Sequence, residues 1–159
     1  MRAALAFGAA AIWAASAVQA EEGFPLTERE AKLEGCVQAA RDMGAEVGIC
    51  AGAVMGLCLD ALTPEAAEGL EGFMCLQEEA FAWDNVTLRA SHDYVTQIEG
   101  RSDIAHAPFV AEMGDRLAAE TETCFDFPVG EEDKVLECKI FGAIERLEWI
   151  YALSEAARE

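Results

Sequence analysis

The stretch FMCLQEEAFAWDNVTLRASHDYVTQI, residues 73–98, decides the fold class. Its apolar and small residues recur in steps of three and four, which places them on one side of an α-helix. The pattern predicts an amphipathic helix of about seven turns. The positions on the predicted buried side are Phe73, Leu76, Ala80, Trp83, Thr87, Ala90, Tyr94 and Gln97 or Ile98.

Shorter helices are predicted on the N-terminal side of this helix. Thr27 can cap the first one, with Glu30 three residues on as its capping-box partner, and this helix runs to about residue 42. Residues 49–62 are predicted to form a short, nearly all-apolar helix, which must be buried or face a partner. The helix start and the breaks that follow are marked by Thr63-Pro64, Gly69 and Gly72.

Two more helices are predicted on the C-terminal side, after a polar connection over residues 100–107. Pro108 begins the first of them, and a turn over residues 126–130 follows it. The last helix has acidic residues at 131–133 in its first turn, where the helix dipole favours them. The residues predicted to face inward are Val110, Met113, Leu117 and Thr121 in the first helix, and Leu136, Ile140, Ala143, Ile144, Leu147 and Tyr151 in the second.

These helices are not interrupted by strand-like alternation, an internal repeat or a low-complexity linker. The predicted fold class is therefore all-α, a single disulfide-stapled bundle of about five helices. Residues 21–159 form one predicted domain, because about 139 residues can bury one real hydrophobic core. Trp83 and Trp149 fall in helical stripes, and core packing is favoured over a ligand platform for both.

Residues 1–20 have the features of a cleavable signal peptide. Arg2 gives a positive start, residues 3–15 are an apolar run too short to span a bilayer, and Val18-Gln19-Ala20 is a small-x-small cleavage site. The alternative, an N-terminal anchor helix, is disfavoured because the run is short and the cleavage site is clear. We therefore expect cleavage after Ala20, a periplasmic location and no membrane insertion of the remaining chain.

Six cysteines follow this leader, and an even number in an exported chain favours disulfides. Six cysteines allow about fifteen pairings, and spacing alone does not choose among them. A metal site is the alternative, but no CxxC occurs, so thioredoxin-like redox chemistry and c-type haem attachment both lack their signatures. The cysteines are Cys36, Cys50, Cys58, Cys75, Cys124 and Cys138.

The chain has 11 basic and 30 acidic residues, a formal charge of −19 that becomes −20 without Arg2. This charge argues against nucleic acid and against anionic membrane surfaces as partners. It permits a cationic partner, and the alternative is that it serves only to keep the protein in solution.

Signatures of catalytic and cofactor sites are absent from the sequence. It contains no GxSxG, P-loop, HExxH or dinucleotide fingerprint, so we predict a protein that is not an enzyme and takes no cofactor or metal. His92 is expected to be exposed, and Asp103 and His106 have the spacing of a metal pair without evident partners. Glu78 and Glu79 are expected on a solvated helix face.

A resemblance to the LprI-like lysozyme-inhibitor family rests on Cys58…Cys75-Leu76-Gln77-Glu78-Glu79-Ala80-Phe81-Ala82-Trp83-Asp84-x-x-x-Leu88. Members are small exported helical proteins with a cysteine pair, an E-x-x-x-W-like stretch on a long helix, and later two cysteines and a helical arginine. Cys124, Cys138 and Arg146 match the last part, and the segment from Cys36 to Cys50 resembles the N-terminal extension of some members. The similarity spans about residues 36–153, although residues 88–92 lack the Asn and Tyr of the family's Leu-Asn-x-x-Tyr box.

The resemblance also implies how the cysteines pair. Its framework joins neighbours in sequence, and each bridge would close a loop of about fifteen residues, worth roughly 3 kcal/mol in the chain-entropy model. The implied pairs are Cys36 with Cys50, Cys58 with Cys75 and Cys124 with Cys138.

The function implied by the resemblance is that of a periplasmic binding protein that inhibits lysozyme-type muramidases. A basic lysozyme would attract so acidic a partner, but the carboxylates in its cleft would repel an acidic plug. We therefore expect a projecting loop with a cationic or polar tip, Gly100-Arg101-Ser102, to make the contact. The alternative is a cell-envelope interaction or scaffold module without effect on lysozyme, with residues 49–62 as its partner surface.

Overall fold

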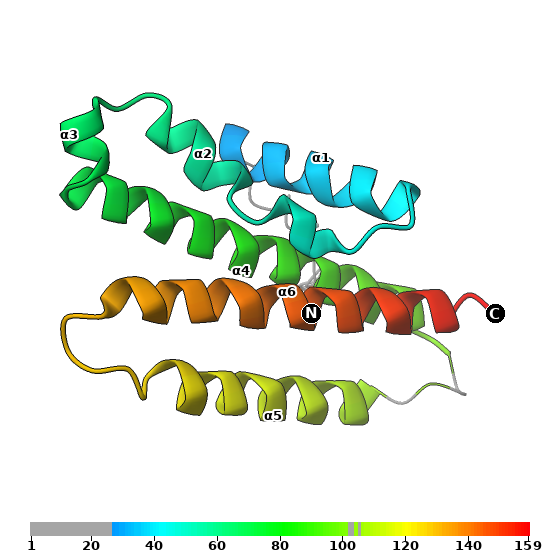
Figure 1. The fold of residues 1–159 in the computed structure, drawn as a ribbon. Coiled ribbons are helices and arrows are strands. Elements are labelled where there is room, and N and C mark those ends of the chain that lie inside the picture. Colours follow the sequence, from blue (N-terminus) through cyan, green and yellow to red (C-terminus); the bar gives the residue numbers. More distant parts are fainter. Residues whose placement is uncertain (1–26, 102–103, 105) are drawn as a thin grey trace, which may run out of the picture.

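The computed structural model describes residues 27–101, 104 and 106–159, so the predicted signal peptide lies outside the described residues. All regular elements in the described part are helices, which confirms the all-α class (Figure 1). They are, in chain order, α1 (Glu28–Asp42), the 3-10 helix η1 (Val47–Cys50), α2 (Ala53–Leu59), α3 (Pro64–Ala67), α4 (Leu70–Ile98), α5 (His106–Cys124) and α6 (Glu132–Ala156).

The two longest helices, α4 and α6, pack along each other and form the centre of the bundle. α1 and α2 cover α4 on one side, while α5 packs mainly on α6 (Figure 1). The α5–α6 connection lies at one end of the bundle, and the C-terminal end of α6 lies at the other. This arrangement leaves much of the surface of α5 without a helix packed against it.

The long helix predicted over residues 73–98 is confirmed as α4, and its buried side is the predicted one. Trp83 is fully buried, and Tyr94 packs against Phe109 of α5 with ring centroids 4.9 Å apart. Phe109 in turn stacks on the half-buried Trp149 of α6, at 5.3 Å between centroids. These rings join α4, α5 and α6 at one level of the bundle, where aromatic burial contributes strongly to stability.

The predicted capping box at the start of α1 is confirmed. The Glu30 backbone N–H donates to the Thr27 hydroxyl at 3.2 Å, and the Thr27 N–H donates to the Glu30 carboxylate at 2.8 Å. The same carboxylate accepts a hydrogen bond from Asn85 of α4. A local sequence signal therefore also fixes where α1 meets the long helix.

The single helix predicted over residues 49–62 is wrong in its continuity, and only part of its apolar surface is buried. Gly52 adopts φ +86°, a left-handed conformation that favours glycine, and it separates η1 from α2. Val54 is buried, but Ile49 is 63% exposed and Leu57 is 44% exposed. The break allows each half to be held by its own disulfide, Cys36–Cys50 and Cys58–Cys75.

The inward side of α5 also differs from the prediction. α5 begins at His106 rather than Pro108, and Val110, Leu117 and Thr121 are exposed. Contacts with other helices decide which side of α5 faces inward. Phe109 near one end packs on α4 and α6, and Cys124 at the other end is bonded to α6. The residues at least partly buried along α5 are Phe109, Met113, Arg116, Glu120 and Cys124.

Glu79 is not on a solvated face, although the neighbouring Glu78 is exposed and pairs with Arg29. Glu79 is only 1% exposed, and its carboxylate accepts backbone N–H donors from Gly52, Val54 and Met55 at 2.7–3.0 Å. A fourth donor is Trp83 Nε1, at 2.7 Å. The carboxylate thus caps the start of α2 from another helix, and four donors offset the cost of burying its charge.

Three disulfides join the helices, in the pairing that the family resemblance implies. Cys36–Cys50 ties α1 to η1, Cys58–Cys75 ties α2 to α4, and Cys124–Cys138 ties α5 to α6. Their Cα atoms lie 5.5–5.9 Å apart, and the bridges span 14, 17 and 14 residues of sequence. Each bridge lowers the conformational entropy of the unfolded chain, which stabilises the folded protein by roughly 3 kcal/mol.

Candidate functional site

The connection over residues 125–131, called here the α5–α6 loop, presents three large apolar side chains to solvent. Val129 is fully exposed, Phe125 is 61% exposed and Phe127 is 37% exposed. Val129 has the highest exposed fraction of any large hydrophobic residue in the described part of the chain. Pro128 and Gly130 explain the sharp turn, because proline cannot continue a helix and Gly130 adopts φ +98°.

The base of this loop is clamped. The Cys124–Cys138 bridge joins the last residue of α5 to α6, and Lys139 Nζ lies 5.0 Å from the ring centroid of Phe125. The Glu131 N–H donates to the Pro128 carbonyl at 3.2 Å, which closes the turn. A short loop held in this way loses little conformational entropy when a partner binds.

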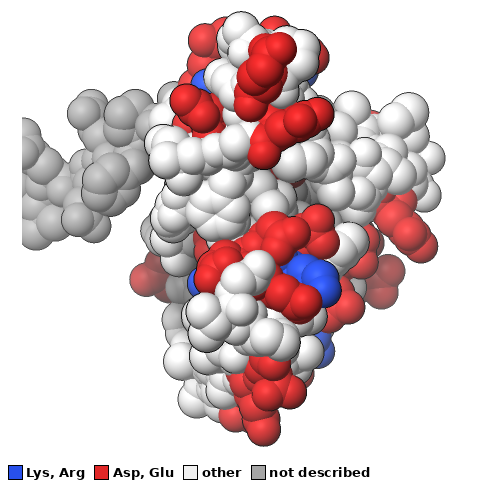
Figure 2. Space-filling view, turned by 60° about the vertical axis from the view of Figure 1, so that its left-hand side comes forward, with Lys and Arg blue, Asp and Glu red and all other residues white. Residues whose placement is uncertain are grey.

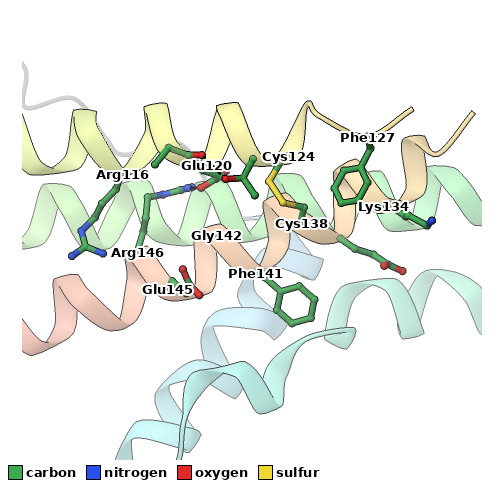
Figure 3. Close-up of a pocket in the computed structure, with 13 residues that line it drawn as sticks. Arg116, Glu120, Cys124, Phe127, Lys134, Cys138, Phe141, Gly142, Glu145 and Arg146 are labelled. Atoms are coloured by element: carbon green, nitrogen blue, oxygen red, sulfur yellow. Dashed lines mark hydrogen bonds and ion pairs between the residues drawn. A yellow bond between two sulfur atoms is a disulfide. The ribbon is translucent and has the colours of Figure 1, made fainter. Parts of the chain in front are cut away.

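A groove of about 680 Å³ between α5 and α6 continues from the loop. Figure 3 shows Phe127 at the loop end of the groove and Phe141 projecting from α6. Glu137 and Glu145 also line the groove, and they have no ion-pair partner among the described residues. Loop and groove therefore form one continuous surface that combines aromatic rings with carboxylates.

The inner end of the groove contains a nearly buried arginine, Arg146, which is 5% exposed. Its guanidinium lies 3.0 Å from the Asp84 carboxylate of α4. It also pairs with Glu120 of α5, and Figure 3 shows these two side chains meeting. Burial lowers the pKa of Arg146, while Asp84 counteracts that shift. Glu120 reaches across Gly142, where a Cβ atom would overlap its carboxylate. This network joins three helices, because Arg146 of α6 forms ion pairs with one carboxylate from α4 and one from α5.

Negative charge surrounds the loop. Residues 122–137 contain six acidic residues and one basic residue, Lys134. Lys134 Nζ lies 2.9 Å from the Glu131 carboxylate, and this hydrogen bond raises the pKa of Lys134. Figure 2 brings this end of the bundle forward and shows carboxylates around an uncharged surface, with few cations. The local field therefore favours a cationic partner.

Of the predicted loop Gly100-Arg101-Ser102, the described residues Gly100 and Arg101 follow the end of α4, at the other end of the bundle (Figure 1). Gly100 adopts φ +80° just beyond α4, and Ser102 lies outside the described residues. Arg101 is exposed, but its guanidinium donates to the carbonyl of Ala157 beyond the end of α6. The cation is thus held against the bundle, which makes the α5–α6 loop the stronger candidate for a projecting contact.

The two histidines are not brought together by the fold. His92 is exposed, as predicted, and its Nδ1 lies 3.9 Å from Asp93. His106 is exposed at the start of α5, and Asp103 lies outside the described residues. Within the described part of the chain, no three histidine, cysteine or acidic side chains are grouped as metal ligands.

No family model, curated protein or solved structure matches this chain. Among the described residues, no helix is long and apolar enough to cross a bilayer. What the chain binds must therefore be inferred from its own surface, and the α5–α6 loop is the feature of that surface with the clearest shape and charge.

Proposed function

We propose that the chain is an exported, acidic binding protein that docks on a basic protein through the α5–α6 loop, and that lysozyme-type muramidases are its partner class. The observation that supports this proposal is the apolar tip itself, with Phe125, Phe127 and Val129 exposed on a disulfide-clamped turn. The resemblance to the LprI-like family points to the same class of partner.

Charge supplies the first step of recognition. A net charge of −19 attracts a basic protein over a distance of about one Debye length, roughly 8 Å at physiological salt. Attraction of this kind mainly raises the rate of association, and it favours partners with a positive net charge. Affinity must come from contacts that exclude water.

The apolar tip supplies those contacts. A few buried aromatic or aliphatic side chains usually dominate the binding energy of a protein interface. Glycoside hydrolases of the lysozyme type cleave sugar between two carboxyl groups, so only the uncharged side chains of the tip can enter such a cleft, and Asp126 must stay outside it. Phe127 and Val129 therefore suit a plug, while the acidic residues around the loop face the basic rim of the enzyme.

Disulfides support the exported location of this function. Three bridges stabilise the described bundle, and such bridges persist in oxidising compartments such as the bacterial periplasm. The cytoplasm would reduce them. A periplasmic site would also expose the chain to muramidases that attack the cell wall.

The test is a titration of a basic lysozyme with the purified chain at about 0.15 M and about 1 M salt, where the Debye length falls from about 8 to about 3 Å. Specific docking predicts saturable inhibition at a one-to-one ratio that persists at high salt. An unrelated protein of equal net charge is the control. Inhibition that disappears at high salt, or that the control reproduces, would refute the proposal.

A second function is supported by an exposed apolar stripe on α4. Leu70, Met74, Phe81 and Leu88 are 51–70% exposed and lie at steps of four and seven residues, on the side opposite the core. Such a stripe fits an amphipathic helix of a cell-envelope protein, as in a scaffold module without effect on lysozyme. In that case Phe81→Ser with Leu88→Ser would release the chain from the envelope fraction, and Val129→Ser would not.

A further inference from the structure

A second groove, of about 550 Å³, is lined by residues of α1, α4 and α6 and by Arg158 after α6. Small residues on the three helices, Gly35, Ala90 and Ser154, leave the space open. Long polar side chains form its walls. The groove is distant from the α5–α6 loop, which projects at the opposite end of the bundle.

Three arginines from different parts of the chain line this groove: Arg41 of α1, Arg89 of α4 and Arg158 after α6. The whole sequence has only 11 basic residues against 30 acidic ones. Three guanidinium groups around one hollow are therefore a local concentration of cations in an acidic chain. Two carboxylates, those of Glu34 and Asp93, line the same groove.

The fold does not use all the donors of these arginines. Arg89 Nε pairs with Glu34, but the Nη2 atom of Arg89 is buried without a hydrogen-bond partner in the described part of the chain. A buried guanidinium N–H without an acceptor is costly, and such groups are rare in folded proteins.

The other two arginines are also incompletely paired. The Arg41 guanidinium lies 3.7 Å from the ring centroid of Tyr151, and its Nη2 reaches Glu155 only at 3.5 Å. Arg158 makes no ion pair with any described residue. Burial raises the pKa of Tyr151. Its hydroxyl, like that of any tyrosine, is protonated at neutral pH and can donate a hydrogen bond.

We propose that this groove binds a small oxyanion, either a phosphate group or a carboxylate, held by Arg41, Arg89 and Arg158. Planar guanidinium groups match both ligands with paired hydrogen bonds, which are stronger when donor and acceptor are charged. Asp93 at the groove offers an acceptor for a hydroxyl group next to the oxyanion. This site is independent of the docking loop.

The test follows the arginine Nε–H resonances of the purified chain by NMR during titration with inorganic phosphate and, separately, with acetate at low salt. We expect saturable shifts at Arg89 and Arg158, and none at Arg116, which lines the groove between α5 and α6 and not this one. The ligand with the lower dissociation constant identifies the source of the oxyanion. Absence of a saturable shift with both ligands would overturn the proposal.

Two variants of equal charge separate the groove from a general charge effect. Arg158→Gln should weaken oxyanion binding by at least about fivefold, because it removes one charged hydrogen-bonding partner. Arg29→Gln removes a cation that pairs with Glu78 outside the groove and should change binding by less than about twofold. Equal weakening by both variants would overturn the proposal. Inhibition of lysozyme should be unchanged in Arg158→Gln, so the two proposals fail separately.

Discussion

The disulfide between Cys124 and Cys138 holds the last residue of α5 against α6, with the two Cα atoms 5.5 Å apart. It closes the base of the loop whose tip is the fully exposed Val129. An exposed apolar tip is a poor contributor to stability, because it buries no surface in the fold. Its position on a covalently clamped turn is the basis of the docking proposal.

Removal of this bridge should weaken partner binding more than its effect on stability alone would. Cys124→Ser with Cys138→Ser should lower the free energy of unfolding by roughly 3 kcal/mol and weaken partner binding, because the loop loses its fixed shape. Cys58→Ser with Cys75→Ser is the matched control, with a similar loss of stability measured by chemical denaturation. Equal loss of binding in both double variants would show that the clamp has no special role.

Glu79 and Glu78 offer a direct comparison of adjacent glutamates. Glu79→Gln should cost about 2–4 kcal/mol, because the amide NH2 would face backbone N–H donors in the buried cap of α2. Glu78→Gln removes only an exposed ion pair with Arg29 and should cost less than about 1 kcal/mol. Urea denaturation of both variants measures the difference, and similar losses would contradict the assigned role of Glu79.

These glutamates also separate what the sequence could predict, the helix that carries them, from what it could not, the burial of Glu79. The periodicity of α4 predicted a long helix, because helical spacing is a local property of the chain. The burial of Glu79 depends on the N–H groups of Gly52, Val54 and Met55, which only the tertiary fold brings together. In the sequence, Glu79 stands beside Glu78, and nothing in this local pattern indicates that only Glu79 caps α2.

The stability of the protein should fall when one member of the ion-pair network around Arg146 is removed. Arg146→Met should cost about 3–5 kcal/mol, because it leaves Glu120 largely buried without its cation. The double variant Arg146→Met with Glu120→Gln should recover part of that loss. Thermal denaturation measures both, and a double variant less stable than Arg146→Met would argue against an uncompensated charge. Asp84 is half exposed, so Asp84→Asn should have a smaller effect.

The capping box of α1 should make stability depend on pH. Burial raises the pKa of Glu30, but hydrogen bonds from Thr27 and Asn85 outweigh it and hold the pKa below the ordinary value of 4.5. A carboxyl whose pKa is lowered by folding stabilises the protein above its unfolded pKa, and this contribution is lost as the pH falls through the folded value. Glu30→Gln should therefore flatten the stability profile below about pH 4.5.

The control for this prediction is Glu28→Gln. Glu28 lies in the same first turn but makes no hydrogen bond to Thr27 or Asn85. Denaturation curves between about pH 3 and about pH 6 should show the flattening in the Glu30 variant alone. The same flattening in both variants would indicate a general effect of charge at the start of α1.

The candidate site was only partly predictable. The segment 126–130 was predicted as a turn, because aspartate, proline and glycine are typical turn residues. Its function was not predicted, although two phenylalanines and a valine within residues 125–131 are an unusual content for a short connection. The prediction of Arg101 as a projecting cation followed from loop polarity, and sequence could not show that Ala157 accepts its hydrogen bond.

Which side of α5 faces the core is likewise decided by contacts with other helices and not by the sequence of α5 alone. Met113 has helical spacing with the predicted Val110 and Leu117, and equally with Phe109. Aromatic packing of Phe109 and the bridge at Cys124 turn α5 so that Met113 is half-buried, as predicted, while Val110 and Leu117 are exposed. Long-range partners, not local periodicity, thus decide which apolar residues of this helix remain exposed.

The most direct test of the docking proposal compares two double variants in inhibition of a basic lysozyme at about 1 M salt, where charge attraction is screened. Phe127→Ser with Val129→Ser removes the apolar tip, and Val110→Ser with Leu117→Ser removes two exposed apolar side chains from the surface of α5. We predict that the tip variant loses at least about tenfold in affinity and that the control stays within about twofold. Equal affinities of the two variants, or no inhibition by the unaltered chain, would contradict docking through the α5–α6 loop.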